Sequence, residues 1–345
     1  MSLQTDASYD AAYDATHDAT YDAMPSSPKA TQWQLFESFE KDASAAAVPC
    51  SFTKHKIIMH GGHVIPSKSN QDWVKTLVTQ DNNAAVVVCD GNGKGKVVNY
   101  LKTVPWERIL TSPNPIQHTR SLIESNVLNT RGDGSTFASV ELLKNGFRCR
   151  WLGDSEILVF HNSTLCWRSR PHSSSDQNEL TRLIKLGVKM TASHGLRAVN
   201  EKHITMIPNP YCVWAPAKYG GIAANKTAFT RGFGHTGLIT TFDGEMQLIK
   251  FNKPGNWRAV VYTDGVGDVA CDKTVQSFGD SSKTPLHIAE TAHKKWNQPW
   301  QYLHPESCQC ETCLSTKTRT LEETTTRIPN PDDVGVAVLE VNVTM

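Results

Sequence analysis

The sequence has almost no net charge, because 35 Lys and Arg residues balance 34 Asp and Glu residues and leave +1 over 345 residues. Such a balance gives no global attraction to nucleic acid or to an anionic membrane surface. We therefore expect neither as a partner. Any recognition of phosphate has to come from a local group of residues.

Long apolar runs and an N-terminal leader are missing as well. A membrane-spanning helix needs about 18 apolar residues in a row, and a secretory leader needs a basic segment followed by an apolar one; neither pattern occurs. The nine cysteines are mostly scattered through apolar runs, as at Cys89, Cys149, Cys166 and Cys271. This distribution favours buried free thiols in a reducing compartment over a disulfide framework. We expect a cytoplasmic or nuclear protein.

Two segments lack the periodicity of packed structure. Residues 8–23 repeat a four-residue acidic, alanine-rich unit that is too short to bury a core, so we predict a disordered tail over 1–31. The folded domain is predicted over 50–345, with residues 297–330 as an insertion or long loop. This loop holds the soft ligands for one tetrahedral zinc, although their spacing favours surface thiols: Cys308, Cys310, Cys313 and nearby His304.

Short apolar runs that alternate with turn residues predict an antiparallel sheet. Strands are expected over 136–143, 147–152, 156–160, 245–251, 257–263 and 334–343. The turns at Asn145-Gly146 and Gly153-Asp154-Ser155 join the first three as a meander, and residues 253–256 are predicted to join the next two as a hairpin. Helical spacing of apolar residues occurs over 176–186 and 285–296. The fold class is therefore α+β.

Carboxylates follow or precede several of these apolar strands. Asp90-Gly91 follows the run 84–89, Asp264-Gly265 follows 259–263, and Asp332 precedes the last strand. One such pair alone is typical of a turn. Several in this order indicate carboxylates that converge on hard cations such as Mg²⁺ or Mn²⁺, and three could hold two ions about 3.5 to 4 Å apart.

The full set of motifs resembles the metal-dependent type 2C protein phosphatases, the PPM family, from about residue 60 to the C-terminus. The matching motifs are Asn70-Gln71-Asp72, Asp90-Gly91-Asn92-Gly93, Gly134-Ser135-Thr136, Gly153-Asp154-Ser155, Asp264-Gly265-Val266-Gly267-Asp268 and Asp332-Asp333. The segment Glu179-x-x-Arg182 resembles part of the family's helix after the meander.

This resemblance implies a four-layer α/β/β/α sandwich, in which helices flank two antiparallel sheets. It implies a monomeric serine/threonine phosphoprotein phosphatase that hydrolyses phosphomonoesters by attack of a metal-bridging water. The expected substrate is a phosphorylated protein, and the expected cofactors are two or three Mg²⁺ or Mn²⁺ ions. Other phosphohydrolases on this fold, which act on small phosphoesters, stay open as well.

The resemblance also assigns roles to individual residues. Asp90 would bridge two ions and Gly91 would offer its carbonyl, while Asp264 and Asp332 would complete the shell of one ion. Asp72 would support metal-bound waters. A third ion would bind at Asp154.

Three departures from the family pattern affect the phosphate side. Ser67 stands where the family has its phosphate-binding arginine, Asn92 replaces a histidine proposed as general acid, and His235 replaces an aspartate. Lys68 is adjacent to the first departure and is predicted to supply the missing charge, though without the bidentate geometry of arginine. The departures favour an alternative, a pseudophosphatase that acts as a binding or regulatory module.

Two other motifs are given no role of their own. The glycine- and lysine-rich segment 91–96 lacks the spacing of a Walker A loop, and Val97 stands where such a loop needs Ser or Thr. Lys94 and Lys96 within it are still expected to attract phosphorylated substrates. The tripeptide 131–133 reads Arg-Gly-Asp and only leads into Gly134.

Overall fold

The structure is a computed structural model that describes residues 54–344, apart from 131, 187, 189, 192–193, 209–210, 214–225, 228, 236–242, 304–320, 327 and 329–330. The tail predicted over 1–31 lies outside the described residues. So do His304 and the three closely spaced cysteines Cys308, Cys310 and Cys313. The described residues belong to one unit, which spans 51–345.

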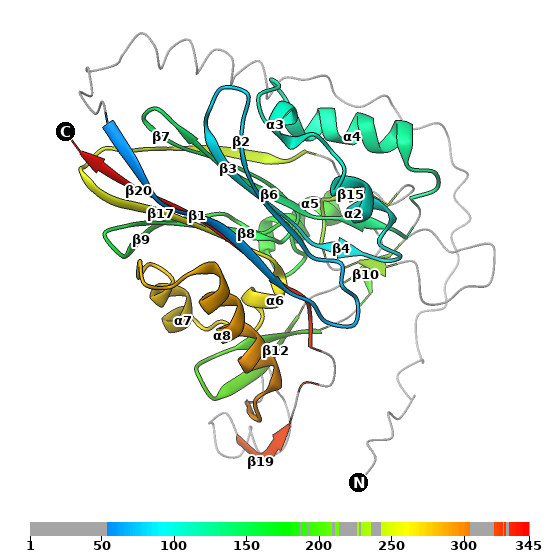
Figure 1. The fold of residues 1–345 in the computed structure, drawn as a ribbon. Helices are drawn as coiled ribbons and strands as arrows, with labels where there is room; N and C mark the ends of the chain where they lie inside the picture. The colour runs from blue at the N-terminus through cyan, green and yellow to red at the C-terminus, as the bar shows by residue number, and fades with distance from the viewer. Residues whose placement is uncertain are drawn as a thin grey trace. The chain divides into compact units, whose positions relative to one another are not determined.

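Two five-stranded antiparallel sheets form the centre of the fold (Figure 1). The first sheet has the order β1 (Lys54–Ile65), β20 (Val334–Thr344), β17 (Gly255–Tyr262), β8 (Glu156–His161) and β9 (Thr164–Arg168). The second has the order β16 (Glu245–Lys250), β7 (Gly146–Leu152), β6 (Phe137–Leu143), β3 (Ala84–Cys89) and β2 (Trp73–Val78).

The two sheets pack face to face through apolar side chains that alternate along the strands. Val86 and Val88 of β3 share one buried cluster with Val261 of β17 and Leu339 of β20. The intervening residues of β3 point to the opposite face of their sheet, since successive side chains of a strand alternate. Burial on both faces explains why β3 is apolar throughout, without the polar alternation of a half-exposed strand.

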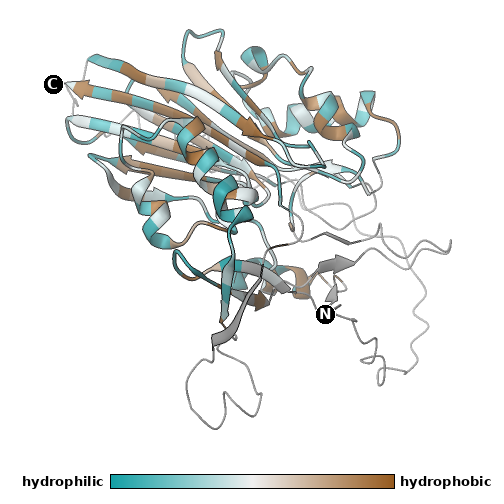
Figure 2. Ribbon diagram, turned by 60° about the horizontal axis from the view of Figure 1, so that its bottom comes forward, coloured by the Kyte–Doolittle hydropathy of each residue, from teal (hydrophilic) through white to brown (hydrophobic). Residues whose placement is uncertain are grey.

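Helices cover both outer faces, which completes four layers (Figure 1). The second sheet is covered by α2 (Lys96–Leu101), α3 (Trp106–Ile109) and α4 (Pro115–Asn126). The first sheet is covered by α6 (Asp264–Gly267), α7 (Asp272–Ser277) and α8 (Pro285–Asn297). Figure 2 shows the corresponding bands of brown and teal along the strands and around these helices. The α+β sandwich implied by the resemblance is confirmed.

Smaller elements complete the described chain. One three-stranded sheet has the order β15 (Phe233–Gly234), β5 (Gly134–Ser135) and β4 (Gly91–Asn92), and another has the order β10 (Met190–Thr191), β13 (Tyr211–Val213) and β14 (Lys226–Thr227). A four-stranded sheet has the order β11 (His194–Ala198), β12 (His203–Pro208), β18 (Trp300–Leu303) and β19 (Leu321–Thr326). Strands β18 and β19 thus lie within the predicted insertion.

The predicted meander is only partly confirmed: β6 and β7 form the expected hairpin around 144–145, but after the turn at 153–155 the chain enters the other sheet, where β8 pairs with β17 and β9. The predicted helix over 176–186 corresponds to α5 (Gln177–Lys185), which Asp176 caps by accepting hydrogen bonds from backbone N–H groups. The second predicted helix corresponds to α8. No helix in the described part of the chain combines the length and apolar character that crossing a membrane requires.

The predicted hairpin between residues 245–251 and 257–263 is wrong. Strand β16 pairs with β7, whereas β17 pairs with β8 and β20 in the other sheet. The turn residues between them do reverse the chain, but β17 is almost fully buried and has a neighbour on each side. The burial of β17 in the centre of the first sheet therefore determines which strands it pairs with, although β16 is nearer in sequence.

The expectation of buried cysteines holds for three of the four whose burial the structure describes. Cys89, Cys149 and Cys271 are buried free thiols, and Cys166 is also free but exposed. Cys166 lies on β9, the last strand of its sheet, where alternate residues face solvent. The apolar neighbours of Cys166 in sequence did not reveal this edge position.

Candidate metal centre

Asp90 follows the end of strand β3 at the edge of the sandwich, where its backbone forms hydrogen bonds with Thr136 of the Gly-Ser-Thr motif. The backbone N–H of Asp90 donates to Thr136 Oγ1 at 3.1 Å, and the carbonyl of Asp90 accepts from the Thr136 N–H at 2.9 Å. The next residue, Gly91, pairs with Ser135 between β4 and β5. A side chain at Gly91 would place its Cβ 2.7 Å from Val98, so packing requires glycine there.

The same threonine fixes the turn that carries Asp154. Thr136 Oγ1 lies 2.7 Å from the hydroxyl of Ser155, in the turn between β7 and β8. Gly153 has a φ of +105°, a conformation that favours glycine. A Cβ on Gly153 would meet Thr136 at 2.7 Å. Thr136 therefore braces the two loops that carry Asp90 and Asp154.

Asp264 begins helix α6 after β17, where a single Asp-Gly pair taken alone would be typical of a turn. A Cβ on Gly265 would lie 1.8 Å from the carbonyl oxygen of Asp333, so the backbones of the two acidic motifs are in close contact. The carbonyl of Gly265 accepts a hydrogen bond from the Trp296 indole at 2.6 Å. The Asp264 motif is thus fixed from both sides.

These three segments bring carboxylates together. Asp90, Asp154 and Asp264 each offer an oxygen atom, and these atoms all lie within 4.8 Å of one another. One carboxylate oxygen of Asp154 is buried and has no hydrogen-bond partner among the described residues. A cluster of carboxylate oxygens with an unpartnered buried member fits a hard divalent cation.

The electrostatics of the cluster agree with that fit. Burial raises the pKa of Asp154 to about 7, and burial followed by the charge of Asp154 raises the pKa of Asp264 to about 7. Burial and the charge of Asp264 also raise the pKa of Asp90 well above its ordinary value. Carboxylates placed this close cannot all stay ionised without a nearby positive charge.

Three further acidic residues surround the group. Burial and the charge of Asp264 raise the pKa of Asp332 to about 7, and those two causes also raise the pKa of Asp268. Asp72 is buried and accepts a hydrogen bond from the Thr263 hydroxyl at 2.7 Å. All three lie outside the close group of three. Asp268 was given no role from sequence, although the Asp-Gly-x-x-Asp spacing places it one helical turn beyond Asp264.

The loop predicted to contact phosphate is organised by Asp333. Its carboxylate accepts hydrogen bonds from the Gln71 N–H and the Ser69 hydroxyl, each at 2.7 Å, and from the N–H of Ser67. Burial alone would raise the pKa of Asp333, but these hydrogen bonds hold it below the usual range. Lys68 lies between two of the bonded residues and is exposed.

Asp133 has a supporting role that the sequence did not reveal. Its buried carboxylate accepts from the backbone N–H groups of Lys94 and Lys96 at 3.1 Å and of Val97 at 3.0 Å. It therefore caps the start of α2 and fixes the loop after Asp90. The exposed Asn92 lies at the end of strand β4, directly before this loop.

His235, the third departure from the family pattern, is part of the packing under the Gly-Ser-Thr motif. Its N–H donates to the Asp133 carbonyl at 2.8 Å, and its ring is centred 5.1 Å from that of Phe229. A Cβ on Gly134 would fall 2.1 Å from the imidazole. Burial lowers the pKa of His235 to about 4. The ring is therefore neutral near pH 7 and packs tightly.

A polar network connects helix α5 to the turn at Gly153. Glu179 accepts hydrogen bonds from Arg182 at 2.7 Å and from Arg231 at 3.1 Å. Arg231 also lies 3.6 Å from Glu245, which is 3.3 Å from His172 Nε2. Nδ1 of this histidine accepts from the Gly153 N–H at 3.1 Å. The resemblance of Glu179-x-x-Arg182 to a family helix thus marks residues that support the Asp154 turn.

Comparisons with known proteins concern the fold. No protein-family model matches the chain, and no curated protein matches it. Among solved structures, a C. elegans sex-determining protein is similar at 15% identity with a TM-score of 0.50, over 90% of this chain and 71% of its own. At this identity the likeness establishes the fold alone.

Two structures named as serine/threonine phosphatases also match. The S. agalactiae enzyme has 12% identity and a TM-score of 0.47, over 84% of this chain and 100% of its own. The phosphatase 2C of Toxoplasma gondii has 15% identity and a TM-score of 0.47, over 84% and 99%. Structures named as serine/threonine phosphatases are thus among those similar to this chain, as the motifs led us to expect.

Proposed function

We propose that this protein is a metal-dependent serine/threonine phosphoprotein phosphatase that hydrolyses phosphomonoesters. The observation that carries the proposal is the group of Asp90, Asp154 and Asp264, whose oxygens meet within 4.8 Å although they come from distant parts of the sequence. Phosphorylated proteins are the proposed substrates, and Mg²⁺ or Mn²⁺ are the proposed ions. The α/β/β/α fold is compatible with this activity but does not by itself assign it.

The proposed metal ligands are Asp90, the Gly91 carbonyl, Asp264 and Asp332, with Asp154 as a ligand of a further ion and Asp72 as support through water. Bound ions would supply positive charge that lowers the pKa of an attacking water and stabilises charge on the transferred phosphoryl group. The chain's own contribution is to hold these groups rigidly. Thr136 performs this for Asp90 and for the turn of Asp154.

The loop held by Asp333 supplies the proposed contact for the substrate phosphate. Its backbone is fixed by three N–H donors, which leaves the Lys68 side chain exposed beside the Asp332 motif. An ammonium group there can attract a phosphate dianion as a point charge. The neighbouring Ser67 places its hydroxyl 2.9 Å from the Ser69 hydroxyl, so this position offers no cation.

The second candidate is a pseudophosphatase that retains the fold and acts as a binding or regulatory module. The neutral side chains of Ser67 and Asn92 favour it, since neither replaces the charge or the proton donor expected from the family. In that case the carboxylates would still bind a cation. The two candidates differ only in turnover.

Hydrolysis of an aryl phosphate and of a phosphothreonine peptide with millimolar Mn²⁺ separates the two candidates. Asp264→Asn is expected to lower kcat/KM at least about a hundredfold. The matched control is Asp272→Asn, an exposed aspartate at the start of α7, which should keep wild-type activity. Wild type that is no faster than Asp264→Asn would exclude the enzyme and favour the pseudophosphatase.

A further inference from the structure

A cavity of about 510 Å³ lies where strand β1 begins, and its lining is strongly basic. It is lined by Lys54, His55, Lys56, Lys144, Asn342 and Thr344. Among these described residues, three are lysines and none is acidic. The cavity is therefore suited to a ligand that carries several negative charges.

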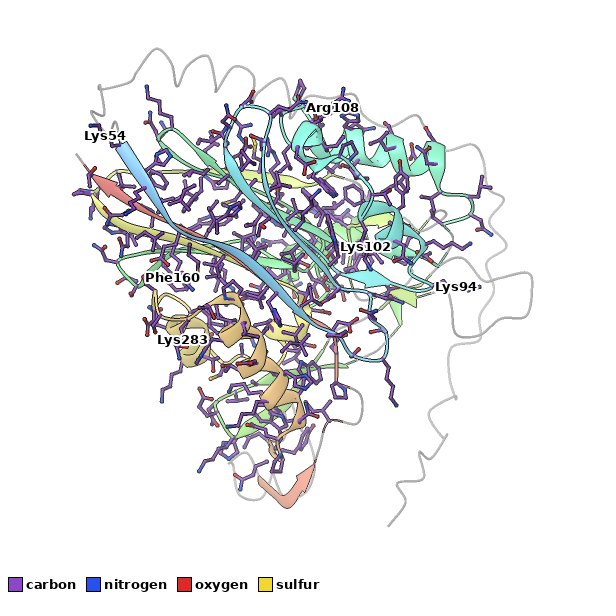
Figure 3. All side chains as sticks on the ribbon, viewed as in Figure 1. Lys54, Lys94, Lys102, Arg108, Phe160 and Lys283 are labelled. Carbon is purple, nitrogen blue, oxygen red and sulfur yellow. The ribbon has the colours of Figure 1, made fainter. Side chains whose placement is uncertain are left out.

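The cavity is remote from the carboxylate group. Figure 3 shows Lys54 at the start of β1, and Lys94, from the loop that follows Asp90, on the opposite side of the molecule. The cavity is therefore separate from the proposed phosphatase site. A ligand bound there would not contact Asp90 or Lys68.

The register of the strands sets the spacing of the basic groups. Lys54 lies opposite Thr344 and Lys56 opposite Asn342, so these four side chains share one face of the sheet. Alternate residues on a strand are about 6.6 to 6.8 Å apart. Lys144 comes from the turn between β6 and β7 in the other sheet. The positive charges thus follow the repeat of an extended chain.

Among the described strands, β1 is also the outermost of its sheet, with β20 as its neighbour. Its first five residues, 54–58, are all exposed, and Ile57 and Ile58 keep 43% and 48% of their surface in solvent. The edge of such a strand presents backbone N–H and C=O groups to which another strand can pair. The edge therefore offers main-chain hydrogen bonds, two apolar contacts and alternating positive charge.

Lysines on an edge strand commonly serve to prevent unwanted pairing. That role accounts for Lys54 and Lys56 but not for Lys144, which belongs to the other sheet and lines the same cavity. It also leaves the exposed pair Ile57 and Ile58 unexplained. A binding edge accounts for all of these residues together.

We propose that the β1 edge and its basic cavity bind an extended acidic segment of a partner protein. The segment would pair its backbone with β1 and direct acidic side chains, at every second position, toward the lysines of the cavity. Apolar residues between them would contact Ile57 and Ile58. This binding is independent of the proposed hydrolysis, because none of these residues belongs to the metal centre.

The test uses the full chain and a fluorescent peptide in which aspartate alternates with valine. Fluorescence anisotropy should show binding that weakens as salt rises. The triple variant Lys54→Glu, Lys56→Glu, Lys144→Glu should raise the Kd about tenfold or more. The matched control carries the same change of charge at exposed lysines elsewhere: Lys102→Glu, Lys273→Glu and Lys294→Glu. Its Kd should change by about twofold at most.

A peptide of the same composition with its aspartates in one block should bind more weakly than the alternating peptide. The proposal is overturned if wild type does not bind the alternating peptide, if both triple variants weaken it equally, or if the two peptides bind alike. Thermal melts confirm that the variants fold. If the triple variant unfolds, the single change Lys144→Gln replaces it, and an unchanged Kd then overturns the proposal.

Discussion

The carboxylates of the proposed metal centre and the lysine proposed to contact phosphate are held in place by different interactions. Asp90 and Asp264 follow strands whose residues are buried in the sandwich, so their positions are fixed by the packing of the core. Lys68 lies in an exposed loop whose backbone donates hydrogen bonds to the Asp333 carboxylate from Ser67, Asn70 and Gln71. The positions of the carboxylates therefore depend on the packed core, whereas the position of Lys68 depends on one loop.

The largest effect is expected from a substitution at Gly265, which follows Asp264 on the side of the site that is held by the packed core. In Gly265→Ala, the new Cβ would lie 1.8 Å from the Asp333 carbonyl oxygen, a backbone atom that cannot rotate away. We expect destabilisation by about 3 kcal/mol or more, measured by urea unfolding. Gly61→Ala is the control, since its nearest neighbour is a Pro285 side-chain atom at 3.5 Å. Equal stability of the two variants would contradict the tight packing of the two acidic motifs.

A second prediction concerns the ion pairs behind the Asp154 turn. Glu179→Gln removes the carboxylate that accepts hydrogen bonds from Arg231 and Arg182, and we expect the free energy of unfolding to fall by about 3 kcal/mol at neutral pH. Glu124→Gln removes an exposed pair with Arg120 instead and should cost about 0.5 kcal/mol or less. Similar losses in both variants would show that the Glu179 network adds no special stability.

The same network predicts a dependence on pH. Burial would raise the pKa of Glu179, but hydrogen bonds from Arg231, Arg182 and Thr230 hold it at about 2. Since an unfolded glutamate titrates near about 4.3, this stabilisation is present above that pH and is lost as pH falls toward 2. The free energy of unfolding of the wild type, measured with urea, should therefore fall as the pH is lowered through this range. The free energy of unfolding of Glu179→Gln should fall less over the same range.

The smallest effect is expected from a substitution in the exposed loop that contains Lys68. Lys68→Ala should raise KM for a phosphothreonine peptide about fivefold and leave kcat nearly unchanged, because a lost charge contact weakens binding of substrate and transition state alike. Lys102→Ala, at an exposed lysine after α2, is the control for a general change of charge. An unchanged KM in the first variant removes Lys68 from the site.

Local patterns in the sequence predicted the parts of the fold that depend on neighbouring residues. The β6–β7 hairpin followed from turn residues, and α5 and α8 followed from helical spacing, but the crossing of β8 into the other sheet did not. Helix α4 was missed, although Asn114 caps it by accepting from the Gln117 N–H and Pro115 opens it. That pattern is readable in the sequence. The partner of β16 was not readable, because it depends on how the two sheets assemble.

The candidate site divides in the same way. Motifs identified Asp90, Asp154 and Asp264, which the structure brings together. The clamps Asp133 and Asp333 act on backbone groups that are distant in sequence, so no local pattern marked their roles. Their effects follow only from the tertiary approach of separate loops.

Calorimetric titration of Mn²⁺ into the metal-free protein near neutral pH tests the central claim most directly, because it measures the carboxylate group without requiring turnover. The claim predicts binding by wild type and a Kd raised about a hundredfold or more in Asp90→Asn. The exposed variant Asp272→Asn should bind as wild type does. Equal affinity of wild type and Asp90→Asn, or no binding by either, would contradict the claim that these aspartates form a metal centre.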